Sequence, residues 1–269
     1  MVGRIPTRVA RFVAALFAAG ALLAVAAGAA SAAGTVIYNS IPSPLPGNVP
    51  SQAFEATSTS EFGGQIELGG ANLSTDKVTV AMSSWACQQG GAEDGSCISA
   101  AGAKFTWPVT LHIYAVGAGN TVGTQVGLLT KTFSMPYRPS ANNLKCKGEG
   151  LGGWYSKGEC FHGKLFKISF SLMGVAIPAK AIVSVSYNTS DYGAAPTGCT
   201  GANACPYDSL NVGVTGNATI GTQPQPNDAY ISSTWGGAYC DNGASGTGTF
   251  RFDPGCWAGT QPEIAVETK

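Results

Sequence analysis

Residues 105–114, FTWPVTLHIY, alternate between apolar and polar side chains. The apolar set is Phe105, Trp107, Val109, Leu111 and Ile113, and the polar set is Thr106, Thr110, His112 and Tyr114. Successive side chains of a β-strand point to opposite sides, so this stretch predicts a strand with one face on a core and the other in water. Pro108 lacks a backbone N–H and therefore predicts an edge or a bulge at that position.

The same alternation returns in six further segments. Their apolar positions are Val78, Val80 and Met82; Phe166, Ile168, Phe170 and Leu172; Val183, Val185 and Tyr187; Leu210, Val212 and Val214; Phe250 and Phe252; and Ile264 and Val266. With weaker segments included, about eleven strands are expected, separated by stretches rich in Gly, Pro, Asn and Ser. We therefore predict an all-β protein, an antiparallel β-sandwich of jelly-roll type with loop disulfides.

The first 33 residues have the pattern of a secretory signal peptide. Arg4, Arg8 and Arg11 form a positive start, residues 12–27 are apolar, and residues 30–32 are small. The alternative is an uncleaved membrane anchor, but the apolar run is shorter than the roughly 20 residues that span a bilayer. The C-terminal residues, PEIAVETK, carry no hydrophobic tail. We expect a secreted, extracellular product without a membrane span, folded as a single β-sandwich domain over residues 34–269.

The charge of the chain excludes some partners. Three of its 15 basic residues lie in the signal segment, which leaves 12 against 15 acidic residues, a formal net charge of −3. Such a chain offers no electrostatic attraction to nucleic acid or to an anionic membrane surface. We expect neither as a partner.

All eight cysteines follow the signal segment, and an even number in an exported chain indicates disulfides. They fall into four close pairs: Cys87 with Cys97, Cys146 with Cys160, Cys199 with Cys205, and Cys240 with Cys256. We predict a disulfide within each pair, closing a surface loop. A zinc site would need a different spacing of cysteine and histidine ligands.

Catalytic motifs are weak. The two histidines are His112, on the polar side of a predicted strand, and His162, which follows Cys160 of a predicted disulfide loop; no Gly-x-Ser-x-Gly motif is present. Serine hydrolase chemistry is therefore not expected. Hydrolysis of a glycosidic bond needs two carboxylates across a groove. Glu55, Glu61 and Glu67 are the nearest candidates, and ordinary surface acids are the simpler interpretation of them.

A cation site is a further alternative. Asp241, Asn242 and Asp253 would approach one another if Cys240 pairs with Cys256, and calcium takes hard oxygen ligands. Asx residues beside glycine and proline are also common turn formers. We expect no cofactor, with calcium at these three residues as the alternative.

Aromatic residues near cysteines and glycines are the remaining signal. They include Trp85, Trp154, Trp235 and Trp257, with Tyr192, Tyr207 and Tyr239 in the same setting. Such rings can serve as platforms for sugars, or they can pack on the disulfides and close the ends of the core. The candidate ligand-binding residues are Asp191, Tyr192, Tyr207, Asp208, Trp235 and Tyr239. Residues 187–212, which hold the first four of these, are interpreted as a disulfide-bonded connector between two strands.

The predicted mature N-terminus resembles that of a group of uncharacterised exported bacterial proteins. The matching positions are Asn39, Pro42, Pro46, Gly47, Asn48, Ser51, Phe54, Glu61, Phe62 and Gly63. The segments CPYDSLNVG, STWGGAYC and GTFRFDPGCW also resemble sequences of that group, so the similarity extends over most of the chain. The resemblance implies export and a β-sandwich, and it carries no known active site.

We therefore expect a non-catalytic extracellular binding or surface protein. An extracellular glycan or a cell-surface ligand is the expected partner. The alternatives are a glycan-active hydrolase or lyase on the same fold, and a structural protein of the cell envelope.

Overall fold

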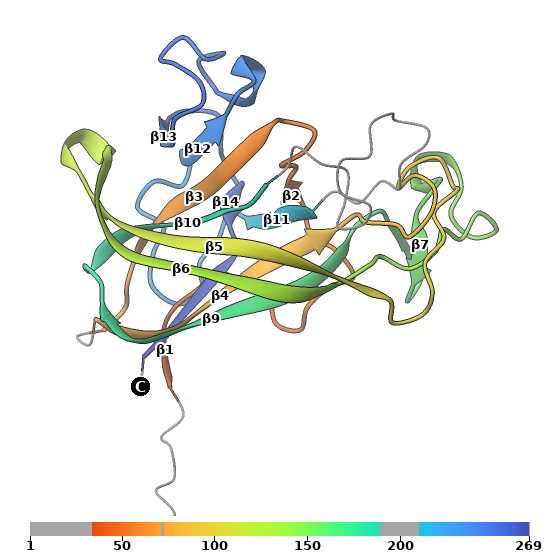
Figure 1. The fold of residues 1–269 in the computed structure, drawn as a ribbon, viewed down its shortest axis with the longest axis horizontal. Coiled ribbons are helices and arrows are strands. Elements are labelled where there is room, and N and C mark those ends of the chain that lie inside the picture. The colour runs from red at the N-terminus through yellow and green to blue at the C-terminus, as the bar shows by residue number, and fades with distance from the viewer. Residues whose placement is uncertain (1–33, 71–72, 189–209, 269) are drawn as a thin grey trace, which may run out of the picture. The chain divides into compact units, whose positions relative to one another are not determined.

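The computed structural model describes residues 34–70, 73–188 and 210–268 (Figure 1). Within these ranges the chain is all β, its strand pairs are antiparallel, and its three helical segments, Ala118–Asn120, Gly148–Gly150 and Gly236–Ala238, are single 3-10 turns. No helix in these ranges is long and apolar enough to cross a membrane. The predicted signal peptide and the predicted Cys199–Cys205 disulfide lie outside them.

One sheet has seven strands and is built around β4 (Ser74–Ser84). On one side β4 pairs along its length with β9 (Lys164–Ala176). On its other side, β4 pairs first with β15 (Ile264–Thr268) and then with β11 (Leu210–Thr215). The remaining strands are β1 (Thr35–Asn39), which pairs with β15, and β2 (Ser51–Gln52) and β14 (Gln261–Pro262), which pair with β11.

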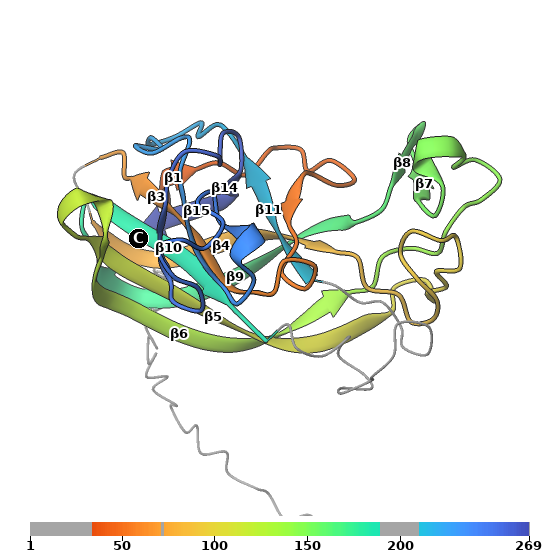
Figure 2. The ribbon, with the colours of Figure 1, turned by 90° about the horizontal axis from the view of Figure 1, so that it is seen from above.

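The second sheet has six strands in the order β13-β12-β3-β10-β5-β6, all labelled in Figure 1, and Figure 2 shows β3, β10, β5 and β6 from above. Their bounds are β13 (Arg251–Asp253), β12 (Ala229–Ser233), β3 (Thr59–Glu67), β10 (Lys180–Ser186), β5 (Lys104–Val116) and β6 (Val122–Pro136). A hairpin of β7 (Trp154–Ser156) and β8 (Glu159–Phe161) stands apart from both sheets in the two views.

One buried cluster joins the two sheets. The seven-stranded sheet contributes Val78, Val80, Phe170, Val212 and Val266, and the six-stranded sheet contributes Phe62, Leu111, Ile113, Val183 and Val185, among others. Phe133 of β6 meets Phe170 of β9 edge to face, with ring centroids 5.0 Å apart, a geometry that the aromatic quadrupole favours. The described residues therefore form the predicted antiparallel β-sandwich. The jelly-roll order of the strands stays a prediction.

Strand β5 confirms the alternation of residues 105–114. Val109, Leu111 and Ile113 are fully buried, while the polar side chains between them are partly exposed. Pro108 pairs with Thr132 of β6 on one side, whereas the pairing of β10 with β5 begins only at Thr110. Among the described residues Pro108 therefore has a strand partner on one side only, which is an edge position of the kind that tolerates proline.

Two details differ from the prediction. The described ranges contain fifteen strands rather than about eleven, and five of them (β2, β7, β8, β13 and β14) are only two or three residues long, too short to show alternation. Phe250 and Phe252 do not join the core cluster. Their rings pack instead near Tyr114 and Tyr230, with centroids 5.5 and 5.2 Å apart respectively, because these tyrosines project from the outer face of the six-stranded sheet.

Three of the four predicted disulfides are confirmed: Cys87–Cys97, Cys146–Cys160 and Cys240–Cys256. Their partners are 10, 14 and 16 residues apart in sequence, so each one closes a loop rather than joining the two sheets. Three disulfides fit an oxidising, extracellular environment.

Candidate functional site

A cleft of about 570 Å³ lies between the end of β4 and the β7–β8 hairpin. Three rings and four polar side chains line it: Trp85, Phe161, His162, Asn48, Ser51, Glu93 and Asn211. We call it the Trp85 cleft. Its volume falls in the range of roughly 300–1,000 Å³ that is usual for small-molecule sites. The mixture of flat rings and amides suits a ligand that is rich in hydroxyl groups.

Segments distant in sequence meet in the Trp85 cleft. Trp85 directly follows β4, and His162 lies where β8 turns into β9. Gly163 permits this approach, because a Cβ at its position would lie 2.3, 2.6 and 2.7 Å from Ser83 Oγ, Trp85 Nε1 and Asn48 Nδ2. A side chain at residue 163 would push the turn away from Trp85.

Hydrogen bonds orient the side chains of the cleft. Trp85 Nε1 donates to Ser83 Oγ over 3.1 Å, and the Ser83 hydroxyl donates to Asn48 Oδ1 over 2.7 Å. The Nδ2 group of Asn48 has no hydrogen-bond partner among the described residues. The rings of Trp85 and His162 lie nearly parallel, 17° apart in plane and 5.8 Å apart between centroids. His162 Nδ1 lies 3.4 Å from the carbonyl oxygen of Ala92, which can accept a hydrogen bond from it.

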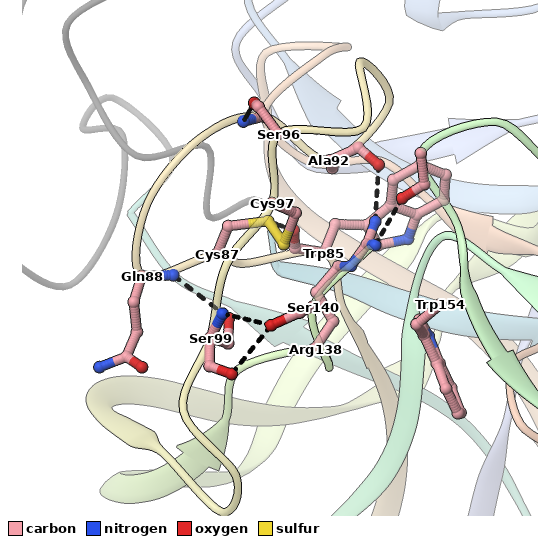
Figure 3. Close-up of a disulfide and its surroundings, with 12 residues drawn as sticks. Trp85, Cys87, Gln88, Ala92, Ser96, Cys97, Ser99, Arg138, Ser140 and Trp154 are labelled. Atoms are coloured by element: carbon pink, nitrogen blue, oxygen red, sulfur yellow. Dashed lines mark hydrogen bonds between the residues drawn. A yellow bond between two sulfur atoms is a disulfide. The ribbon is translucent and has the colours of Figure 1, made fainter. Parts of the chain in front are cut away.

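Arg138 holds the loops that border the cleft (Figure 3). Its side chain is fully buried and donates to the carbonyl oxygens of Ala92 and Gly152, each over 2.6 Å, and to that of Pro139 over 3.2 Å. Burial lowers the pKa of the Arg138 guanidinium to about 10, so it stays charged at neutral pH. Ala92 lies within the Cys87–Cys97 loop and Gly152 within the Cys146–Cys160 loop. One side chain thus links the two disulfide loops.

The acids predicted to bind calcium are occupied by N–H donors. Asp241 accepts from Arg251 Nη2 over 2.7 Å and from the amides of Gly243 and Ser245. Asp253 accepts from the Cys240 amide, from the indole of Trp257 and from Arg251 Nη1 over 3.4 Å. Arg251 therefore supplies the positive charge between the two carboxylates, and the arrangement does not fit calcium.

The pKa of Asp241 reflects this network. Hydrogen bonds from the side chain of Ser245, from Arg251 and from the amides of Ser245 and Gly243 hold the pKa of the Asp241 carboxyl below its usual range. Asn242 is exposed and has a φ of 53°. This left-handed conformation is typical of asparagine in a turn, which was the alternative to a calcium ligand. Cys240, Asp253 and Cys256 lie close enough to hold a metal, but the two sulfur atoms form a disulfide and are not free to bind one.

The other predicted ligand-binding residues have different environments. Trp235 is exposed on the loop that follows β12. Tyr239 is buried in the core cluster, where its hydroxyl donates to the carbonyl of Ser233 and accepts from the amide of the same residue. Tyr239 therefore offers no ring surface to a ligand. Asp191, Tyr192, Tyr207 and Asp208 lie outside the described residues.

The three candidate catalytic acids do not line the Trp85 cleft. Glu61 lies on the outer face of the six-stranded sheet and accepts hydrogen bonds from Tyr114 and Ser184. Glu67 forms an exposed ion pair with Lys180 at 3.6 Å. Glu55 lies in the segment between β2 and β3. Surface acids remain the simpler interpretation of these residues.

The residues of the cleft were not singled out as ligand-binding by the sequence. A signal was present, because Trp85 lies two residues before one disulfide and His162 two residues after another. The sequence does not show that the Cys87–Cys97 and Cys146–Cys160 loops meet. Their contact depends on the close approach at Gly163 and on the hydrogen bonds of the buried Arg138.

The fold and the cleft define an antiparallel, disulfide-bonded all-β protein with a ring-lined polar site near its loop disulfides. Comparison with known proteins finds no matching family model, no matching curated protein and no matching solved structure. The resemblance to exported bacterial proteins stays a prediction.

Proposed function

We propose that this protein is secreted and binds a carbohydrate in the Trp85 cleft without cleaving it. The observation that supports this most directly is the nearly parallel pair of Trp85 and His162 rings beside the Asn48 amide, all in one cleft. Flat rings pack on the apolar face of a sugar, and amides bond to its hydroxyl groups. Hydrogen bonds already hold Trp85 and Asn48 in place, which lowers the entropy lost on binding.

The number of carboxyl groups that line the Trp85 cleft favours sugar binding over sugar hydrolysis. Glu93 is the only acidic side chain among the described residues that line it. Most glycosidases need two carboxyl groups, one as an acid and one as a base or nucleophile. A single exposed glutamate can accept hydrogen bonds from a sugar but cannot fill both catalytic roles.

The test is a glycan array, followed by calorimetric titration of any sugar bound and by assay of reducing-sugar release. We expect binding by the wild-type protein with no release of sugar. Trp85→Ala should weaken binding at least tenfold, because truncation of an aromatic anchor costs on the order of 1.4 kcal/mol or more. Trp85→Phe keeps a flat ring and should retain more affinity than Trp85→Ala.

The matched control is Tyr155→Ala. Tyr155 is a partly exposed ring on β7 that does not line the cleft. This variant should bind as the wild-type protein does. If Trp85→Ala is folded by circular dichroism and binds with unchanged affinity, the Trp85 cleft is not the site. Sugar release that disappears in Glu93→Gln would instead establish a hydrolase.

A further inference from the structure

Trp235 differs from the other four tryptophans of the chain because it alone is exposed, with 52% of its surface accessible. It ends the stretch after β12 and opens the Gly236–Ala238 turn, in the blue loop at the top of Figure 1. Its backbone is anchored at both polar groups. The amide donates to Ser233 Oγ over 2.9 Å, and the same hydroxyl lies 3.2 Å from the Trp235 carbonyl oxygen.

Gly237 supports one face of the Trp235 ring. A Cβ at Gly237 would lie 2.5 Å from Cζ2, 2.7 Å from Cε2 and 3.1 Å from Cη2 of the indole. These nearly equal distances place the Cβ position over the ring face, since an approach at the ring edge would leave both neighbours of Cζ2 much farther away. The absence of a side chain at residue 237 therefore lets the indole lie flat on the backbone. The exposed surface of Trp235 is therefore on the ring face that points away from Gly237.

The loop that follows Trp235 and its turn, closed between Cys240 and Cys256, is held by several independent contacts. The Cys240–Cys256 disulfide closes it, and Arg251 bonds to Asp241 over 2.7 Å. The Arg251 guanidinium also lies 4.2 Å from the ring centroid of the buried Tyr239. An indole with an anchored backbone beside such a loop is oriented before any ligand arrives, so little ordering is needed on binding.

The exposed residues around Trp235 indicate which class of ligand its ring could bind. Thr234, which precedes it in sequence, and Asn242, whose carbonyl oxygen lies across the turn from Gly236, are both exposed, polar and uncharged. A protein-binding patch would need contiguous apolar surface, which these residues do not provide. The Trp235 indole N–H has no hydrogen-bond partner among the described residues. One flat ring with a free donor, among hydroxyl and amide groups, matches a sugar.

We propose that Trp235 is a second carbohydrate contact, separate from the Trp85 cleft, and that the protein binds polysaccharides at two places. This inference rests on the proposed function. The ligand would be an uncharged sugar ring stacked on the open face of the indole, with a ring oxygen or hydroxyl accepting from Nε1. Two weak contacts on one polymer raise the apparent affinity well above that of either alone.

The test uses tetrasaccharides and the parent polymers of cellulose, xylan, chitin and laminarin. Titration of the bound tetrasaccharide should give two sites per wild-type chain and one site each for Trp235→Ala and Trp85→Ala. Apparent affinity for the polymer should fall at least tenfold in each single variant. Trp235→Phe, which keeps a flat ring, should restore part of the polymer affinity.

The outcomes separate the two proposals. If Trp235→Ala changes neither the number of sites nor the polymer affinity while Trp85→Ala removes binding, the second contact is wrong and the proposed function stands. If Trp235→Ala lowers binding and Trp85→Ala does not, the Trp235 contact is supported and the Trp85 cleft is wrong. If neither variant changes the binding of these sugars, both proposals are overturned.

Discussion

Arg138 illustrates how one residue can organise loops that have no regular structure. It is the largest fully buried side chain in the described part of the chain, and its charge is met by carbonyl oxygens rather than by a carboxylate. Hydrogen bonds to a charged group contribute about 1.5–3 kcal/mol each. Two disulfide loops therefore depend on this guanidinium for their relative position.

We expect Arg138→Lys to lower the free energy of unfolding by about 2–3 kcal/mol. Lysine keeps the charge, but its single nitrogen cannot reproduce the fork that reaches both Ala92 and Gly152. Denaturant unfolding followed by fluorescence measures the change. Lys131→Arg, at an exposed position on β6, is the control and should change the free energy by less than about 0.5 kcal/mol. An Arg138→Lys variant as stable as the wild-type protein would show that the two carbonyl contacts contribute little.

At the scale of elements, the strands follow from local pattern and the loops do not. Alternation in residues 105–114 needs only the sequence of β5, and pairing of neighbouring cysteines needs only their spacing. The outward packing of Phe250 could not be predicted in this way, since it depends on Tyr114 from another strand. The same holds for Asp241, because its ion pair with Arg251 forms only when the loop between them folds.

The β7–β8 hairpin gives a prediction at this scale. The Cys146–Cys160 disulfide ties β8 of the hairpin to the segment that precedes β7, and Cys160 itself lines the Trp85 cleft beside Phe161 and His162. Replacing both cysteines by serine should lower the free energy of unfolding by up to about 3 kcal/mol. It should also weaken sugar binding in the cleft several-fold, because the position of the His162 ring is no longer fixed.

The matched control replaces Cys240 and Cys256 by serine. That loop is of similar length but does not line the cleft. Both double variants are titrated in a Trp235→Ala background, so that only the cleft is measured. We expect both to be less stable and only the Cys146 and Cys160 variant to lose affinity. Equal affinities in the two would contradict a role of the hairpin in shaping the cleft.

For the whole molecule, the stability should depend on pH through one buried acid. Glu263, between β14 and β15, is 2% exposed, and its Oε2 is buried without a hydrogen-bond partner among the described residues. Burial raises the pKa of the Glu263 carboxyl from 4.5 to about 7. The folded state therefore binds this proton more tightly than the unfolded state does. As pH rises from about 4.5 to about 7, the free energy of unfolding should fall, and above that range this contribution should be constant.

The expected loss is on the order of 3 kcal/mol across this interval. Glu263→Gln cannot ionise, so its stability should change less between these pH values, and it should exceed the wild-type stability most clearly at pH 7 and above. Glu267→Gln is the control, because Glu267 lies on the adjoining strand β15 in a partly exposed ion pair with Lys77 at 2.7 Å and exposed pairs contribute only about 0–1 kcal/mol. Urea unfolding at intervals from pH 4.5 to 8 measures all three proteins. If the wild-type and Glu263→Gln curves run parallel, Glu263 is not the group whose proton is coupled to folding.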